Sequence, residues 1–293
     1  MSMEIAPICG TIPYKNVKPK LLLNAGFPSS GNTSLYYTLW SNKYGHGGNV
    51  KESNYLLHIQ SPQIEKDREK LHRRKNKYGK GMYRPWSLPD NMFMHKHRFD
   101  KKPSLDNYID YYLKLWKDID GKYQSLLDFS NSNQQLREEF MLSIKDELLK
   151  NFDIKVVMML RDPIRRLWSV CNRKALTEGG TPQSHMEFDD PNLSYIDKYK
   201  RYVRVWGEDN VKVIINEEFY AGYTYPLSCF LEHDIKPRYS KITRLSKMKD
   251  DLYSQWCNLE YKTWKYAYEN MKWVYDEFEN KFSYIPNDWA SCI

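Results

Sequence analysis

The stretch from Gly26 to Trp40, which reads GFPSSGNTSLYYTLW, most constrains what this chain can fold into. It follows Leu21-Leu22-Leu23, an apolar run typical of a buried parallel strand. Turn-forming residues between Gly26 and Gly31 end that strand, and a helical stretch begins at Thr33. A strand, a small-residue loop and a helix in this order aim free backbone N–H groups and the positive end of a helix dipole at one point. The pattern therefore predicts a phosphate-binding loop in an α/β fold.

The loop departs from the nucleotide-binding consensus G-x-x-x-x-G-K-[ST] at the lysine. Gly26 and Gly31 have the right spacing and Thr33 supplies the hydroxyl, but Asn32 stands at the lysine position. A P-loop kinase or NTPase needs that lysine and an acidic magnesium ligand after an apolar strand. The candidate ligand, Asp162, lies inside an arginine motif instead. A P-loop kinase or NTPase is therefore only an alternative interpretation of this loop. A catalytically impaired nucleotide-binding protein is a second alternative.

Length, hydropathy and cysteine content set the broad class. A chain of 293 residues, 41% hydrophobic, can bury a full core, so we expect one domain over 1–293. No apolar segment approaches the roughly 20 residues that a membrane span needs, and the N-terminus does not read as a signal peptide. The five cysteines are scattered and lack C-x-x-C spacing, which argues against a disulfide framework or a zinc site. We expect a cytoplasmic protein without a metal.

Positive charge is concentrated between residues 66 and 102. The net charge of +8 favours anionic partners, and this stretch carries much of the excess, interleaved with aromatic residues. Basic and aromatic residues together can bind nucleic acid, but no recognised module surrounds them, so we do not expect a nucleic-acid partner. A solvated insertion is the alternative interpretation. His95 and His97 lie in the same stretch without supporting ligands, and we reject a metal site there.

The rest of the chain alternates helical and strand patterns. Helices are predicted after an N-cap at Ser104, around 136–148, over 195–206 with Gly207 as the stop, over 226–232, and over a long C-terminal stretch at 250–282. Strands are predicted at 123–129, 154–160 and 211–215. Residues 45–48 read as a turn. In the stretch 49–55 that follows, Glu52 would lie at the end of a short strand; a solvated surface carboxylate is the alternative.

A second anion-binding element is predicted where the strand at 154–160 runs into a helix. Pro163 fits the first helical position, which would leave Arg161 at the carboxyl end of the strand and Ser169 about two turns along the helix. An arginine fork and a hydroxyl near a helix start can bind an anion. An arginine that caps local carbonyls is the alternative interpretation.

Together these motifs resemble the sulfotransferases that use 3′-phosphoadenosine 5′-phosphosulfate (PAPS). Residues 28–35 resemble the family's loop P-K-S-G-T-T-S-L, and 161–169 resemble its motif R-N-P-x-x-R-x-x-S. Lys51-Glu52-Ser53-Asn54-Tyr55 is similar to the K-E-x-x-[YF] segment of the branch related to heparan-sulfate and other carbohydrate sulfotransferases. Tyr195, Trp206-Gly207, the strand at 211–215 and Glu218-Phe219 follow in the order of that branch, so the resemblance covers roughly residues 20–235.

The resemblance implies a three-layer α/β sandwich with a central parallel sheet and a P-loop-like phosphate-binding loop. It also implies direct transfer of a sulfuryl group from PAPS to an acceptor hydroxyl or amine, without a metal, which leaves adenosine 3′,5′-bisphosphate. Glu52 would be the base. The nucleotide-binding residues implied by the family motifs are Ser29, Ser30, Gly31, Asn32, Thr33 and Ser34 for the 5′-phosphate, Arg161 and Ser169 for the 3′-phosphate, and Tyr195.

Two departures from the family pattern concern cations. Family members carry lysine or arginine at the position of Ser29, and the heparan branch has E-K-S where this chain has Asp128-Phe129-Ser130. If the chain is an active enzyme, another cation must reach the bridging oxygen of the donor, and Lys51 is the candidate because it adjoins Glu52. The basic stretch at 66–102 would face the acceptor, which favours an anionic carbohydrate as the acceptor.

Overall fold

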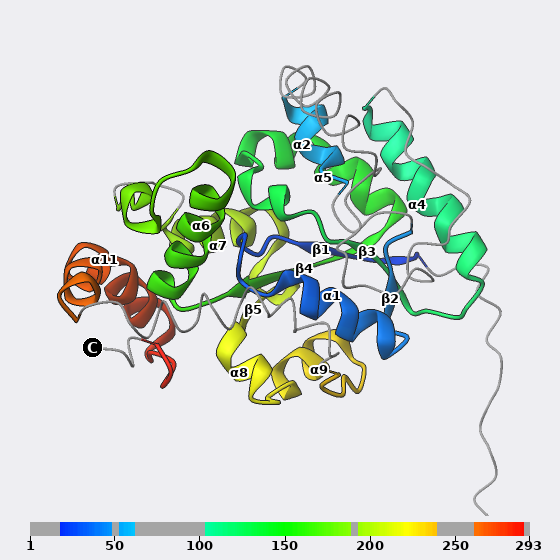
Figure 1. The fold of residues 1–293 in the computed structure, drawn as a ribbon. Helices are drawn as coiled ribbons and strands as arrows, with labels where there is room; N and C mark the ends of the chain where they lie inside the picture. The colour runs from blue at the N-terminus through cyan, green and yellow to red at the C-terminus, as the bar shows by residue number, and fades with distance from the viewer. Residues whose placement is uncertain (1–17, 49–52, 62–102, 189–192, 239–260, 290–293) are drawn as a thin grey trace, which may run out of the picture.

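A parallel β-sheet lies at the centre of the fold (Figure 1). The computed structural model describes residues 18–48, 53–61, 103–188, 193–238 and 261–289. Within these ranges the sheet has five strands in the order β2-β3-β1-β4-β5. The strands are β1 (Lys20–Asn24), β2 (Gly45–His46), β3 (Ser125–Asp128), β4 (Asp153–Leu160) and β5 (Val211–Ile215). The predicted α/β fold with a central parallel sheet is confirmed.

The order of the strands places a switch point between β1 and β4. Strand β1 pairs in parallel with β3 on one side and with β4 on the other. The chain leaves β1 toward β2, on the far side of β3, whereas it leaves β4 toward β5 in the opposite direction. Connections that diverge from two adjacent strands open a crevice at the carboxyl ends of those strands, which is where open α/β sheets bind ligands.

Helices cover both faces of the sheet (Figure 1). One core joins Leu21 and Leu23 of β1 to α4, α5, α6, α7 and α11, and the other joins Leu22 to α1, α8 and α9. Side chains alternate along a strand, so neighbouring leucines enter opposite layers. The helices are α1 (Asn32–Ser41), α2 (Tyr55–Gln60), α4 (Leu105–Ile119), α5 (Glu138–Asn151), α6 (Pro163–Glu178), α7 (Tyr195–Trp206), α8 (Asn216–Tyr220), α9 (Tyr225–Leu231) and α11 (Tyr261–Phe282).

Several helix ends follow the predicted caps. The side chain of Ser104 accepts a hydrogen bond from the backbone N–H of Asn107, 3.2 Å away, at the start of α4. Gly207 ends α7 with φ of 85°, a conformation that glycine adopts without strain. Helix α11 begins at Tyr261, so the part of the predicted helix before that residue lies outside the described residues. None of the described helices is long and apolar enough to cross a membrane.

The predicted turn at 45–48 is wrong for its first two residues. Gly45 and His46 form β2, and Tyr55 begins α2. A Cβ at Gly45 would lie 2.5 Å from Cδ2 of Leu127, so this glycine permits close packing on β3 and does not mark a turn. Residues 49–52 lie outside the described residues, as does the basic stretch at 66–102.

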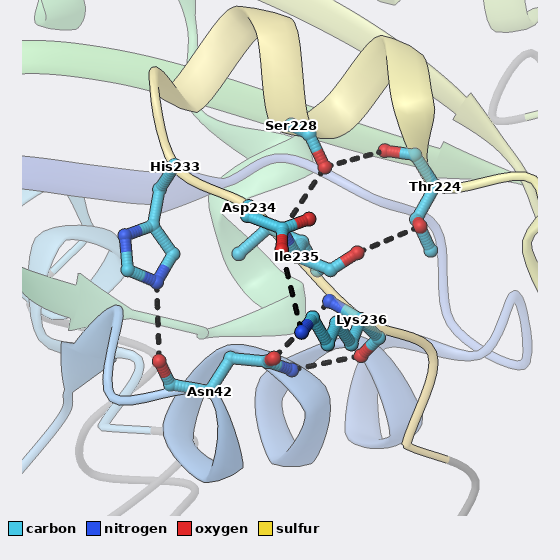
Figure 2. Close-up of polar contacts among 7 residues, drawn as sticks. All are labelled: Asn42, Thr224, Ser228, His233, Asp234, Ile235 and Lys236. Atoms are coloured by element: carbon cyan, nitrogen blue, oxygen red, sulfur yellow. Dashed lines mark hydrogen bonds and ion pairs between the residues drawn. The ribbon is translucent and has the colours of Figure 1, made fainter. Parts of the chain in front are cut away.

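Asn42, at the carboxyl end of α1, holds the segment that follows α9 (Figure 2). Its side-chain Nδ2 donates to the carbonyl of Lys236 at 2.8 Å, and its Oδ1 accepts from the N–H of Lys236 at 3.1 Å. The ring Nε2 of His233 lies 3.1 Å from the carbonyl oxygen of Asn42. Ile235 is held from the other side, because its N–H donates to Ser228 and its carbonyl accepts from Thr224. The end of α1 is therefore fixed to a segment almost two hundred residues away.

Candidate functional site

The loop between β1 and α1 offers a group of hydrogen-bond donors. Ser29 and Gly31 have left-handed backbone conformations, with φ of 66° and 95°. Among the described residues, the backbone N–H groups of Ser29, Gly31, Asn32 and Thr33 have no hydrogen-bond acceptor, and the hydroxyl of Ser30 is buried without a partner. Free amides in such a loop, at the N-terminus of a helix, form an anion-binding site.

Asn32 does not replace the consensus lysine in its usual role. Its side chain is buried, and Nδ2 donates to the carbonyl of Phe27 and to Oδ1 of Asn131, both at 2.8 Å. The side chain therefore ties the start of α1 to the residues that follow β3. The loop therefore offers amides and hydroxyls as donors, without a lysine from this position.

Two more amide side chains hold the loop, one at the end of β1 and one directly after β5. Oδ1 of Asn24 accepts from the N–H of Gly26 at 3.1 Å, and Nδ2 of Asn216 donates to the carbonyl of Ser30 at 2.8 Å. Gly31 is needed here, because a Cβ at this position would lie 2.2 Å from Nδ2 of Asn216. The sequence analysis missed Asn24, Asn131 and Asn216. Their common signal is an amide side chain at the carboxyl end of a parallel strand, or a few residues beyond it.

The hydroxyls at the start of α1 differ in their surroundings. The hydroxyl of Ser34 is hydrogen-bonded to that of Tyr220 in α8, and burial raises the pKa of Tyr220. Thr33 is partly exposed, and its hydroxyl has no partner among the described residues. Thr33 is therefore the freer of these two predicted phosphate ligands.

Arg161 joins the end of β4 to the loop. Its Nη1 donates to the carbonyl of Ser29 at 3.1 Å, the only hydrogen bond its guanidinium makes within the described ranges. A guanidinium has five N–H groups, so four stay available for a ligand. Burial lowers the pKa of Arg161, whereas the carboxylates of Glu217 and Asp162 act in the opposite direction. An arginine keeps its charge in such surroundings. Arg161 therefore binds a backbone carbonyl and keeps other donors available.

Tyr195 is fully buried behind Arg161. Its hydroxyl donates to the carbonyl of Arg161 at 2.7 Å and accepts from Nε of Arg166 at 3.1 Å. Its ring lies 4.7 Å from the ring of Phe27 in the loop, measured between centroids, and burial raises the pKa of Tyr195 to about 12. The hydrogen bond from Tyr195 therefore fixes the backbone carbonyl of Arg161. Ser169 is partly buried on α6, and its side chain has no partner among the described residues.

The predicted catalytic residues Lys51 and Glu52 lie outside the described residues. The residues that follow them are anchored at the carboxyl end of β3, the strand next to β1. The hydroxyls of Ser53 and Ser130 are 3.2 Å apart, and the N–H of Asn54 donates to the Ser130 hydroxyl at 3.0 Å. Ser132 donates to Oδ1 of Asn54 at 2.6 Å. The structure thus brings the chain just after Glu52 to the same edge of the sheet as the loop.

Comparison with known proteins identifies the fold. No protein-family model matches the sequence, and no curated protein matches it. Among solved structures, the chain is similar to a sulfotransferase from Alicyclobacillus acidocaldarius, with a TM-score of 0.54 and 16% sequence identity. The match covers 93% of this chain and 99% of that one. At this identity the likeness establishes the fold, which is that of a sulfotransferase, with the P-loop-like element between β1 and α1.

Proposed function

We propose that the protein is a sulfotransferase that moves a sulfuryl group from PAPS to an acceptor hydroxyl or amine. The observation that carries the proposal is a pair of elements with free hydrogen-bond donors at the carboxyl ends of the adjacent strands β1 and β4. The bond from Arg161 to the carbonyl of Ser29 joins them. A nucleotide with phosphate groups at both its 5′ and 3′ positions suits such a pair, and the likeness in fold to a sulfotransferase supports the same ligand.

The residues present fit this nucleotide. The amides of the loop from Ser29 to Thr33 and the hydroxyls of Ser30 and Thr33 would hold the 5′-phosphate. The buried Ser30 hydroxyl supports this assignment, because a buried polar group without a partner costs about 1–3 kcal/mol. The free N–H groups of Arg161 and the hydroxyl of Ser169 would hold the 3′-phosphate. Tyr195 would act on the nucleotide through Arg161, whose carbonyl it binds.

The bound donor supplies an activated sulfuryl group, and the chain's own residues then have two tasks. Glu52 would accept the proton of the acceptor hydroxyl or amine. The loop amides and the helix dipole would stabilise negative charge on the nucleotide side. A serine at position 29 donates one hydrogen bond but carries no charge, so Lys51 would supply the missing cation. The anchoring of Ser53 on Ser130 supports both assignments, since a peptide bond tethers Glu52 to Ser53.

The acceptor and the cellular location are further parts of the proposal. The basic stretch at 66–102 favours an anionic carbohydrate as the acceptor, and the scattered cysteines favour the cytoplasm. A P-loop kinase is less well supported, because Asn32 has its side chain engaged by Phe27 and Asn131 where such an enzyme needs lysine.

Ligand-dependent melting of the protein tests the proposal. Adenosine 3′,5′-bisphosphate should raise the melting temperature more than 5′-AMP or ATP with magnesium, because it alone of the three occupies both elements. At about 100 times its dissociation constant a ligand adds roughly 2.7 kcal/mol of stability, which is readily measured. A transfer assay with labelled PAPS and a panel of carbohydrate acceptors tests the reaction itself. Equal or greater stabilisation by ATP with magnesium would contradict the proposal.

A further inference from the structure

A carboxylate that the proposed mechanism does not use holds the turn from β4 into α6. Oε1 of Glu217 accepts from the backbone N–H of Asp162 at 3.2 Å, and Oε2 accepts from the indole N–H of Trp289 at 3.0 Å. Burial raises the pKa of Glu217, and hydrogen bonds from the Trp289 indole and from the backbones of Glu217 itself and Asp162 oppose that rise. The indole of Trp289 and the backbone of Asp162, the residue next to Arg161, thus donate to different oxygens of one carboxylate.

Trp289 also contacts the other residues that hold this turn. Its side chain is 4% exposed, and its ring centroid lies 6.1 Å from those of both Tyr195 and Tyr275. Tyr195 donates to the carbonyl of Arg161, and Tyr275 donates to Oδ2 of Asp162 at 3.1 Å. Tyr195, Tyr275 and Glu217 all contact Trp289, and each makes a hydrogen bond with Arg161 or Asp162.

Loss of the indole N–H would leave Oε2 of Glu217 buried without this donor. A carboxylate in that state must rotate toward another donor or take up a proton, and either change weakens its hold on the Asp162 amide. Asp162 also starts α6, since its side chain accepts from the N–H of Arg165 at 2.8 Å. A shift at Asp162 therefore moves both Arg161 and the helix that carries Ser169.

We infer that Trp289 is a positioning residue for recognition of the 3′-phosphate, acting through Glu217 on the backbone of Asp162 and so on Arg161. This inference rests on the proposed function, in which Arg161 and Ser169 hold that phosphate. It assigns Trp289 no contact with the nucleotide. Its role is to fix the geometry of the phosphate-binding turn.

The test is Trp289→Phe, which keeps an aromatic ring and removes the hydrogen-bond donor. The matched control is Trp206→Phe, because Trp206 is similarly buried and its indole N–H has no partner among the described residues. Calorimetric titration with adenosine 3′,5′-bisphosphate and with 5′-AMP separates recognition of the 3′-phosphate from binding of the rest of the nucleotide. We expect Trp289→Phe to weaken the bisphosphate about tenfold, or ~1.4 kcal/mol. Its affinity for 5′-AMP should stay within about twofold, and Trp206→Phe should change neither.

A second variant covers the case in which Trp289→Phe does not fold. Glu217→Gln offers one acceptor oxygen to two donors, so the same selective loss of bisphosphate affinity is expected. The inference is overturned if these variants weaken both nucleotides equally, as a general loss of structure would, or leave bisphosphate affinity unchanged. A parent protein that binds the bisphosphate no tighter than 5′-AMP would instead refute the proposed function, and the inference with it.

Discussion

Gly31→Ala should destabilise the protein for two separable reasons. Gly31 has φ of 95°, and a Cβ there would lie 2.2 Å from Nδ2 of Asn216 and 3.2 Å from Sδ of Met159. A left-handed conformation costs a residue with a Cβ about 1–2 kcal/mol. Displacing Asn216 also breaks its 2.8 Å bond to the carbonyl of Ser30, which is worth about 1 kcal/mol. The free energy of unfolding should therefore fall by about 2–3 kcal/mol.

A double-mutant cycle separates the backbone strain from the clash. Asn216→Ala alone loses the bond to Ser30, at about 1 kcal/mol. In the double variant the bond is lost once and the clash is gone, so its cost should be about 1 kcal/mol less than the sum of the single variants. Urea denaturation followed by circular dichroism measures all four proteins. If the cost of the double variant equals the sum of the two single costs within about 0.3–0.5 kcal/mol, the close approach of Gly31 to Asn216 is refuted.

Three further predictions concern binding and turnover. Arg161→Ala should weaken adenosine 3′,5′-bisphosphate roughly 10- to 100-fold in calorimetric titration, because it removes charged hydrogen bonds, and Arg161→Lys should lose less because it keeps the charge. Glu52→Gln should leave nucleotide affinity nearly intact and lower turnover about 10²–10⁴-fold in the transfer assay, the usual contribution of a general base. Ser29→Lys should raise turnover or create it, while Lys51→Ala in the parent should abolish it. The stability of Ser29→Lys should change little, because position 29 has φ of 66° and serine and lysine meet the same left-handed strain there.

Each of these predictions has an outcome that contradicts it. Unchanged bisphosphate affinity in Arg161→Ala would remove Arg161 from the 3′-phosphate site. Normal turnover of Glu52→Gln would mean that another group is the base. A parent enzyme that is fully active with Lys51→Ala and unaffected by Ser29→Lys would require a different cation, for example one from residues 66–102.

Local patterns in the sequence predicted most of the sheet. Leu21-Leu22-Leu23 and the apolar run at 154–160 lie in β1 and β4, and the strand at 211–215 has the predicted ends. These strands are buried on both faces, so their residues form continuous apolar runs that stand out in the sequence. Strand β2 was missed because it has only two residues, and its Gly45 is needed for packing on Leu127 rather than for a turn.

The site could be predicted only in part from the sequence, because many of its contacts join residues that are far apart in the chain. The loop and Arg161 follow from short motifs, but Asn32 and Asn131 are 99 residues apart, and Ser30 and Asn216 are 186 apart. No periodicity links such pairs, which become neighbours only when the carboxyl ends of parallel strands meet. The substitution of Asn32 for lysine is visible in the sequence, whereas its role as a tie to Phe27 and Asn131 requires the fold.

The contact between Asn42 and Lys236 sets a minimum time before the end of α1 can be anchored during synthesis. The two residues are 194 positions apart. At about 5–20 residues per second, roughly 10–40 s separate their emergence from a ribosome. Strand β1 also waits for β3 and β4, both more than a hundred residues further along, before either of its edges is paired. For that interval the loop between β1 and α1 follows an unpaired apolar strand, so the nascent chain exposes an unpaired strand edge and apolar surface of the kind that chaperones bind.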